Sequence, residues 1–143
     1  MRLTILKVKT EKRKIGDIGE RAAAKFLKRA GYKILERNFV CEGGEVDIIC
    51  ADKTTVAFVE VKTRTIGKES SFEPRPASAV TPEKQRKIIK IASLYGAVFG
   101  KGKKKRLDII EVFIDDSGKA PRVKEIKHLP AAFDRSDAFG RHS

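Results

Sequence analysis

Two short apolar segments, residues 45–51 and 56–64, are separated by the break DKTT. Both segments are rich in β-branched residues, which favours strands, and the break is short enough for a hairpin. The charged residues that interrupt the two segments are Glu45, Asp47, Glu60 and Lys62. Few positions in a fold accept a hairpin whose apolar strands contain charged residues. This feature therefore restricts the possible folds of the chain more than any other.

Strand alternation predicts where these charges lie. Side chains along a strand point alternately to the two faces of its sheet, so Glu45 and Asp47 share one face, and Glu60 and Lys62 share one face of the next strand. The opposite face, expected to be the buried one, consists of Val46, Ile48, Cys50, Val59 and Val61. The charged side chains are therefore expected to gather on a single face of the hairpin.

The hairpin loop decides how the two inner acids meet. If the loop is residues 53–54 or 52–55, Asp47 lies directly opposite Glu60, whereas a loop of residues 52–53 makes them diagonal neighbours. In either case the two carboxylates are close enough to share an ion.

Opposed carboxylates repel each other unless a positive charge lies between them. Magnesium is an oxygen-seeking cation that proteins hold with one or two carboxylates, together with phosphate and water. Lys62, on the face of Glu60, is placed to orient a water and to offset charge on an attacked phosphate. The alternative is a polar sheet face on which Lys62 neutralises an acid in a cross-strand ion pair.

Helices and further strands are predicted around the hairpin. Asp17 as N-cap and Glu20 three residues later form a capping box, so a helix of about 14 residues is expected to begin there and to end at Gly31. Thr81 as N-cap predicts a second helix over residues 82–97. The other predicted strands are residues 33–40, 107–114 and 123–129. The order α-β-β-β-α-β-β indicates a mixed central sheet flanked by helices, an α/β fold.

The connections and the ends complete this interpretation. Residues 65–80 form a long loop, a kind of loop that is often functional, and residues 100–106, GKGKKKR, form a basic turn that is either a phosphate clamp or mobile. The 143 residues are most simply one domain, with the core over about 15–133 and a peripheral basic N-terminal segment and C-terminal tail. Cys41 and Cys50 show neither zinc-ligand spacing nor a disulfide framework.

Charge and hydropathy narrow the function classes. Lysine and arginine number 32 against 19 acids, a net charge of +13, which predicts a polyanionic partner, with nucleic acid first because basic residues release the counterions of phosphates. Solubility alone is the alternative. No apolar run approaches the roughly 18 residues that suggest a membrane span, and no signal peptide is recognisable, so a cytoplasmic protein without membrane contact is expected.

Several stretches together resemble a known family. They are GDIGERAAAKFLKRAGYKILERNF, GEVDII, FVEVKTR, RLDII and IKHLPAAF, in that order, and they are similar to the YraN family of bacterial proteins. That family belongs to the restriction-endonuclease-like superfamily and is similar to archaeal Holliday-junction resolvases. The PD-(D/E)xK motif of the superfamily matches Asp47, Glu60 and Lys62, with Val46 in place of the proline.

The resemblance implies a restriction-endonuclease-like α-β-β-β-α-β core and cleavage of DNA with Mg or Mn held by Asp47 and Glu60. Related nucleases often add an acid from the first helix, which Glu20 matches; its alternative role is the capping box of Asp17. Glu45 is either an outer ligand or a solvated acid at the strand end.

Basic residues near the second helix are expected to bind the DNA backbone. The first turn of a helix offers free amides and the positive end of the dipole to a phosphate. The candidates are Arg64, Lys84, Gln85, Arg86 and Lys87, and their alternative is a solvated basic face. Duplex or branched DNA, held by its phosphates, is the expected partner.

Two other function classes are kept. One is a non-catalytic module that binds DNA or RNA with this fold, and the other is an interaction protein that docks on an acidic partner; salt-sensitive binding to duplex DNA separates the former from the latter. Junction resolvases act as symmetric pairs, but no dimer surface is recognisable, so a homodimer stays an open possibility.

Overall fold

The computed structural model describes residues 2–66 and 80–134, with side chains described from residue 13 onwards. Within these two ranges lie two helices and five strands, in the predicted order α-β-β-β-α-β-β. Their bounds are α1 Arg2–Arg29, β1 Lys33–Cys41, β2 Gly44–Ala51, β3 Thr55–Ile66, α2 Pro82–Phe99, β4 Lys104–Asp115 and β5 Arg122–Leu129. None of the helices in these ranges is long and apolar enough to cross a membrane.

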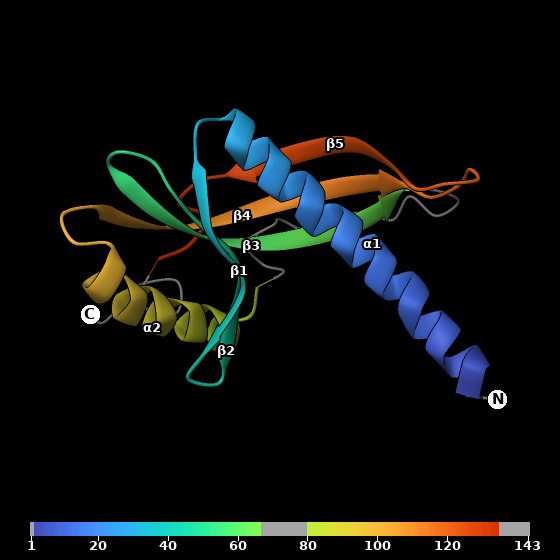
Figure 1. The fold of residues 1–143 in the computed structure, drawn as a ribbon, viewed down its shortest axis with the longest axis horizontal. Coiled ribbons are helices and arrows are strands. Elements are labelled where there is room, and N and C mark those ends of the chain that lie inside the picture. The colour runs from blue at the N-terminus through green and yellow to red at the C-terminus, as the bar shows by residue number, and fades with distance from the viewer. Residues whose placement is uncertain (1, 67–79, 135–143) are drawn as a thin grey trace.

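The five strands form one mixed sheet in the order β1-β2-β3-β4-β5. All neighbours are antiparallel except β3 and β4, which are parallel and are connected through α2. A parallel pair needs such a crossover, whereas the antiparallel pairs close with short turns. The helices lie on opposite sides of the sheet, α1 on one face and α2 on the other (Figure 1). This arrangement is consistent with the expected restriction-endonuclease-like core.

Both faces of the sheet are buried. The cluster under α2 is built mainly from Val46, Ile49, Phe58, Ile88, Ile91, Tyr95 and Ile109. The cluster under α1 is built mainly from Ala23, Leu27, Ile48, Cys50, Val59, Ile110 and Val112. The expectation of one buried and one charged face is therefore wrong, because each helix covers one face of the three inner strands.

The alternation of side chains also breaks within the β1–β2 hairpin. Val46 packs with the cluster under α2, whereas Ile48 and Cys50 pack under α1, so the predicted shared face of these three residues is wrong. Opposite this point, Asn38 of β1 has a φ of +53°. A residue in this left-handed conformation turns the strand, and both strands change faces at the same level.

Helix α1 is longer than predicted. It runs without interruption from Arg2, so Asp17 lies inside the helix and the predicted start at Asp17 is wrong. The residues before it include many good helix formers, and these outweigh a local capping pattern. The C-terminal end agrees with the prediction: the helix stops at Arg29 and Gly31 follows with a φ of +99°.

The predicted start of α2 is confirmed. The hydroxyl of Thr81 accepts a hydrogen bond from the backbone amide of Lys84 at 3.2 Å, and Pro82 occupies the first turn. The basic turn predicted for residues 100–106 is shorter, because β4 begins at Lys104 and pairs with β3. β3 runs to Ile66, and residues 67–79 of the predicted long loop lie outside the described residues, as does the tail from residue 135.

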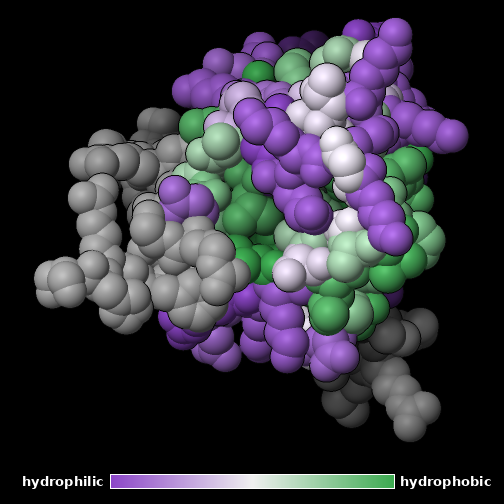
Figure 2. All heavy atoms as spheres, turned by 90° about the vertical axis from the view of Figure 1, so that its left-hand side faces the viewer, coloured by the Kyte–Doolittle hydropathy of each residue, from purple (hydrophilic) through white to green (hydrophobic). Residues whose placement is uncertain are grey.

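Apolar surface is exposed at the C-terminal half of α2. The exposed residues there are Leu94, Val98 and Phe99. Figure 2 shows one end of the molecule, where a central apolar area is bordered by hydrophilic side chains. The surface of the chain is thus basic overall but not uniformly polar.

Helix α1 approaches β3 very closely at Gly19. A Cβ atom built there would lie 2.1 Å from Oγ1 of Thr63 and 3.2 Å from its Cβ. Thr63 is β-branched and sits in a strand, so its side chain has little freedom to move away. Only glycine lets the helix lie this close to the strand that carries Glu60 and Lys62.

We predict that Gly19→Ala lowers the free energy of unfolding by about 1–3 kcal/mol, because the added methyl group overpacks the contact with Thr63. Gly16→Ala is the matched control on the same helix, since none of the described residues comes within 4 Å of a Cβ built at Gly16. That control is expected to gain about 0.5–1 kcal/mol from the better helix propensity of alanine. Urea unfolding followed by circular dichroism measures both; a Gly19→Ala variant as stable as Gly16→Ala would contradict the close approach.

Candidate functional site

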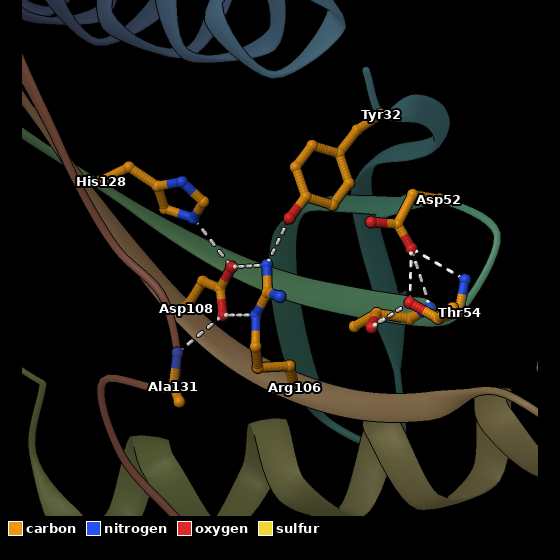
Figure 3. A network of polar contacts seen from close by, with 8 residues as sticks. Tyr32, Asp52, Thr54, Arg106, Asp108, His128 and Ala131 are labelled. Atoms are coloured by element: carbon orange, nitrogen blue, oxygen red, sulfur yellow. Dashed lines mark hydrogen bonds and ion pairs between the residues drawn. The ribbon is translucent and has the colours of Figure 1, made fainter. Parts of the chain in front are cut away.

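The β2–β3 loop settles the register that the sequence left open. The side chain of Asp52 accepts hydrogen bonds from the backbone amides of Thr54 and Thr55, each at 2.9 Å (Figure 3). The strands pair from Ala51 opposite Val56 onwards. This register is the one in which the two acids are directly opposed, and the diagonal alternative does not occur.

Asp47 lies where β2 and β3 separate. Their pairing ends at Ile48 opposite Val59, and its continuation places Asp47 opposite Glu60. Oδ2 of Asp47 accepts a hydrogen bond from the backbone amide of Val61 at 2.8 Å. The carboxylate thus provides an acceptor for a strand amide at the point where regular pairing stops.

Glu60 is a charged residue in the middle of the sheet. It is only 3% exposed, and burying a carboxylate without compensation is costly. Nζ of Lys84, from the first turn of α2, donates a hydrogen bond to Oε2 of Glu60, and Nζ of Lys62 lies 3.6 Å from the same oxygen. Two ammonium groups therefore stabilise this one carboxylate.

The protonation of the site reflects the crowding of its acids. Burial and the negative charge of Glu60 raise the pKa of Asp47 to about 7. Burial lowers the pKa of Lys84, but its hydrogen bond to Glu60 and the charges of Glu60 and Asp47 outweigh that effect, and the pKa is raised. Asp47 and Glu60 therefore lie close enough for their carboxyl groups to interact electrostatically.

The two carboxylates fit a magnesium or manganese ion. Oε1 of Glu60 is buried and has no hydrogen-bond partner among the described residues, so it is an available oxygen ligand beside Asp47. Within residues 2–66 and 80–134, no group of three or more His, Cys, Asp or Glu side chains is placed to hold a metal. Two carboxylates with water and phosphate are a typical set for magnesium, so the donors present match that ion.

Glu20 on α1 lies near enough to these acids for its charge to act on Asp47. Its Oε1 is 3.9 Å from Nη2 of Arg37 on β1, and burial raises its pKa. The charge of Glu20 in turn contributes to the raised pKa of Asp47. Glu45 is exposed on β2. A metal role for Glu20 stays a prediction, as does an outer role for Glu45.

The sheet face next to Lys62 holds a second ion pair that the sequence did not predict. Nε of Arg64 lies 3.3 Å from Oε2 of Glu111, and Glu111 is 3% exposed. Parallel pairing of β3 with β4 places Glu111 beside Lys62. The strand pattern of β4 alone contained no signal for this, because the partner strand had to be known. Arg64 is thus engaged within the sheet, and its role in DNA binding stays a prediction.

The predicted backbone-binding residues of α2 point in different directions. Gln85 is buried and its side-chain amide donates to the carbonyl of Val80 at 2.8 Å. Arg86 is exposed, and Nζ of Lys87 lies 3.6 Å from the carboxylate of Glu83. A surface hollow of about 580 Å³ is lined, among the described residues, by Glu42, Glu83, Arg86, Lys87, Ile89, Lys90 and Ser93. The exposed side of α2 is thus mainly basic in its N-terminal half, while Gln85 faces the interior.

A separate polar network lies on the α1 side of the sheet (Figure 3). Nε and Nη2 of Arg106 each donate to one oxygen of the fully buried Asp108 at 2.8 Å, and Nη2 also donates to the hydroxyl of Tyr32 at 2.7 Å. His128 and the amide of Ala131 complete the shell of Asp108, at 2.8 and 3.0 Å. Through these contacts Asp108 and its partners connect β4, β5 and Tyr32, which follows α1.

We predict that Asp108→Asn destabilises the protein in a pH-dependent way. Burial raises the pKa of Asp108, but hydrogen bonds from His128 and Arg106 outweigh it and hold the pKa below its ordinary value. The ionised form therefore stabilises the fold at neutral pH, and that contribution is lost as the pH falls through the folded-state pKa. The expected gap to wild type is about 2–4 kcal/mol at pH 7, shrinking below about pH 4.

Denaturant unfolding between pH 7 and pH 3 measures this gap. Asp116→Asn is the control, because Asp116 is exposed on a turn. A gap for Asp108→Asn that stayed constant over this range would show that its ionisation does not stabilise the fold.

Comparison with known proteins places the chain in a family. The model of "Uncharacterised protein family UPF0102" matches residues 19–112. A UPF0102 protein of Caldanaerobacter subterraneus is 42% identical over 126 residues, covering 87% of this chain and 98% of the relative. A UPF0102 protein of Geobacter metallireducens is 45% identical over 124 residues, covering 84% and 92%. The chain therefore belongs to the UPF0102 family, the YraN family that its motifs resemble.

Proposed function

We propose that this chain is a metal-dependent endonuclease that hydrolyses phosphodiester bonds in duplex or branched DNA. The observation that carries the proposal is the meeting of Asp47 and Glu60 at the separation of β2 and β3, with the ammonium of Lys62 3.6 Å from Glu60. Bringing these three groups together costs stability, since Glu60 is buried and Asp47 is half-buried. Such a cost is typical of a functional site.

The residues of the site have different roles in the proposed reaction. Asp47 and Glu60 would hold Mg²⁺ or Mn²⁺, and the available Oε1 of Glu60 supports this role. When bound, the cation lowers the pKa of water and neutralises charge on the phosphate. Lys62 lies on the same side of the sheet as Glu60, where it orients the attacking water and stabilises the charge that develops on the phosphate.

The basic surface would hold the DNA around this centre. Lys84, in the first turn of α2, touches Glu60, so the helix that carries Arg86, Lys87 and Lys90 begins at the acids. Backbone phosphates crossing this helix would thus be neutralised close to the bond that is cut. The net charge of +13 makes this affinity strong at low salt and weak at high salt.

We expect Asp47→Asn and Lys62→Ala each to reduce Mg²⁺- or Mn²⁺-dependent cleavage by about 100-fold or more while most DNA affinity remains. The first change removes a metal ligand, and the second removes the charge beside the phosphate. Cleavage is measured on linear, nicked, flap and four-way-junction DNA of one sequence, with EDTA as the metal-free control. Asp116→Asn is the control, because Asp116 is an exposed acid between β4 and β5, and this variant should cleave at nearly the wild-type rate.

Each result has a clear meaning. Unchanged cleavage by both Asp47→Asn and Lys62→Ala would contradict the assignment of the site. Salt-sensitive DNA binding by the wild type without cleavage of any of the four substrates would instead favour a non-catalytic binding module.

A further inference from the structure

We propose that Lys84 is a tethered cation that occupies Glu60 in the metal-free protein and competes with the divalent ion for it. The inference rests on the proposed function and extends it. In this inference Lys84 controls the affinity of the site for metal. Its position in the first turn of the helix would by itself suggest only contact with a phosphate.

The contact of Lys84 is with the carboxylate itself. Its Nζ donates to Oε2 of Glu60, the same oxygen that lies 3.6 Å from Lys62. Glu60 is buried, but the side chain of Lys84 is 43% exposed, against 26% for Lys62. Lys84 therefore reaches the acid from the surface, and its ammonium can move from Glu60 into solvent. Lys62 is more enclosed.

The site already holds two positive charges before any metal ion is added. Two carboxylates, Asp47 and Glu60, face two ammonium groups, Lys62 and Lys84. A divalent cation added to this set would be repelled by both lysines, and the repulsion is strong where charges are partly buried. Departure of the Lys84 side chain from Glu60 removes one of these repulsions and frees a carboxylate oxygen.

Only the side chain of Lys84 needs to move. Its backbone amide is held by the hydroxyl of Thr81 at the N-cap, so the first turn of α2 stays in place. An ammonium released from Glu60 remains tethered at this turn, where a DNA phosphate is expected to bind. Lys84 would then exchange the carboxylate for a phosphate, which makes metal binding and DNA binding support each other.

Titration calorimetry with Mn²⁺ alone, at low ionic strength and without DNA, tests the competition. Lys84→Gln should bind Mn²⁺ about three- to tenfold more tightly than wild type, the effect of losing one partly exposed, charge-assisted contact. Lys84→Arg keeps the charge and should bind close to wild type. Lys90→Gln, an exposed lysine of the same helix, is the matched control for the lost charge and should also bind like wild type.

The outcomes separate this inference from the proposed function. If wild type binds Mn²⁺ and Lys84→Gln binds it equally or more weakly, the competition is absent. If Lys90→Gln tightens binding as much as Lys84→Gln, the effect is one of overall charge, and the inference is wrong. If neither wild type nor Lys84→Gln binds Mn²⁺ at millimolar concentration, the proposed metal-dependent function fails together with it.

Discussion

The burial of Glu60 in the middle of the sheet is the constraint on which the rest of the site depends. β3 has a neighbouring strand on each side and a helix over each face, so the carboxylate has almost no water to solvate it. In the described residues it is compensated by ammonium groups from two elements, Lys62 on β3 and Lys84 on α2. Thr81 and Pro82 fix the first turn of α2, and this turn holds Lys84 beside the buried carboxylate of Glu60.

The second acid is brought in by an irregularity in the neighbouring hairpin. β1 and β2 change faces together at Asn38, and β2 then leaves β3, so that Asp47 bonds a strand amide of β3 with its side chain. On the other side of the sheet, Gly19 lets α1 lie close enough for the charge of Glu20 to reach Asp47. Charged side chains from α1, α2, β2 and β3 thus come together in one region.

The sequence predicted the parts of this site that depend on local pattern. Alternation along β3 placed Glu60 and Lys62 on one side, and the Thr81-Pro82 pair correctly began α2. Contacts that depend on tertiary docking were not predictable: Lys84 touches Glu60 only because α2 packs on that face, and Glu111 lies beside Lys62 only because β4 joins β3 in parallel. The change of faces near Asp47 was missed because a left-handed residue interrupts the regular period of two.

The most direct measurement of the central claim is the position of a bound ion. Crystals soaked in Mn²⁺ and measured at the manganese absorption edge give anomalous density for the metal alone. The account predicts a peak within coordination distance of a carboxylate oxygen of both Asp47 and Glu60, and its loss in Asp47→Asn crystals. A wild-type crystal with Mn²⁺ bound elsewhere, or with none at these two acids, would contradict it.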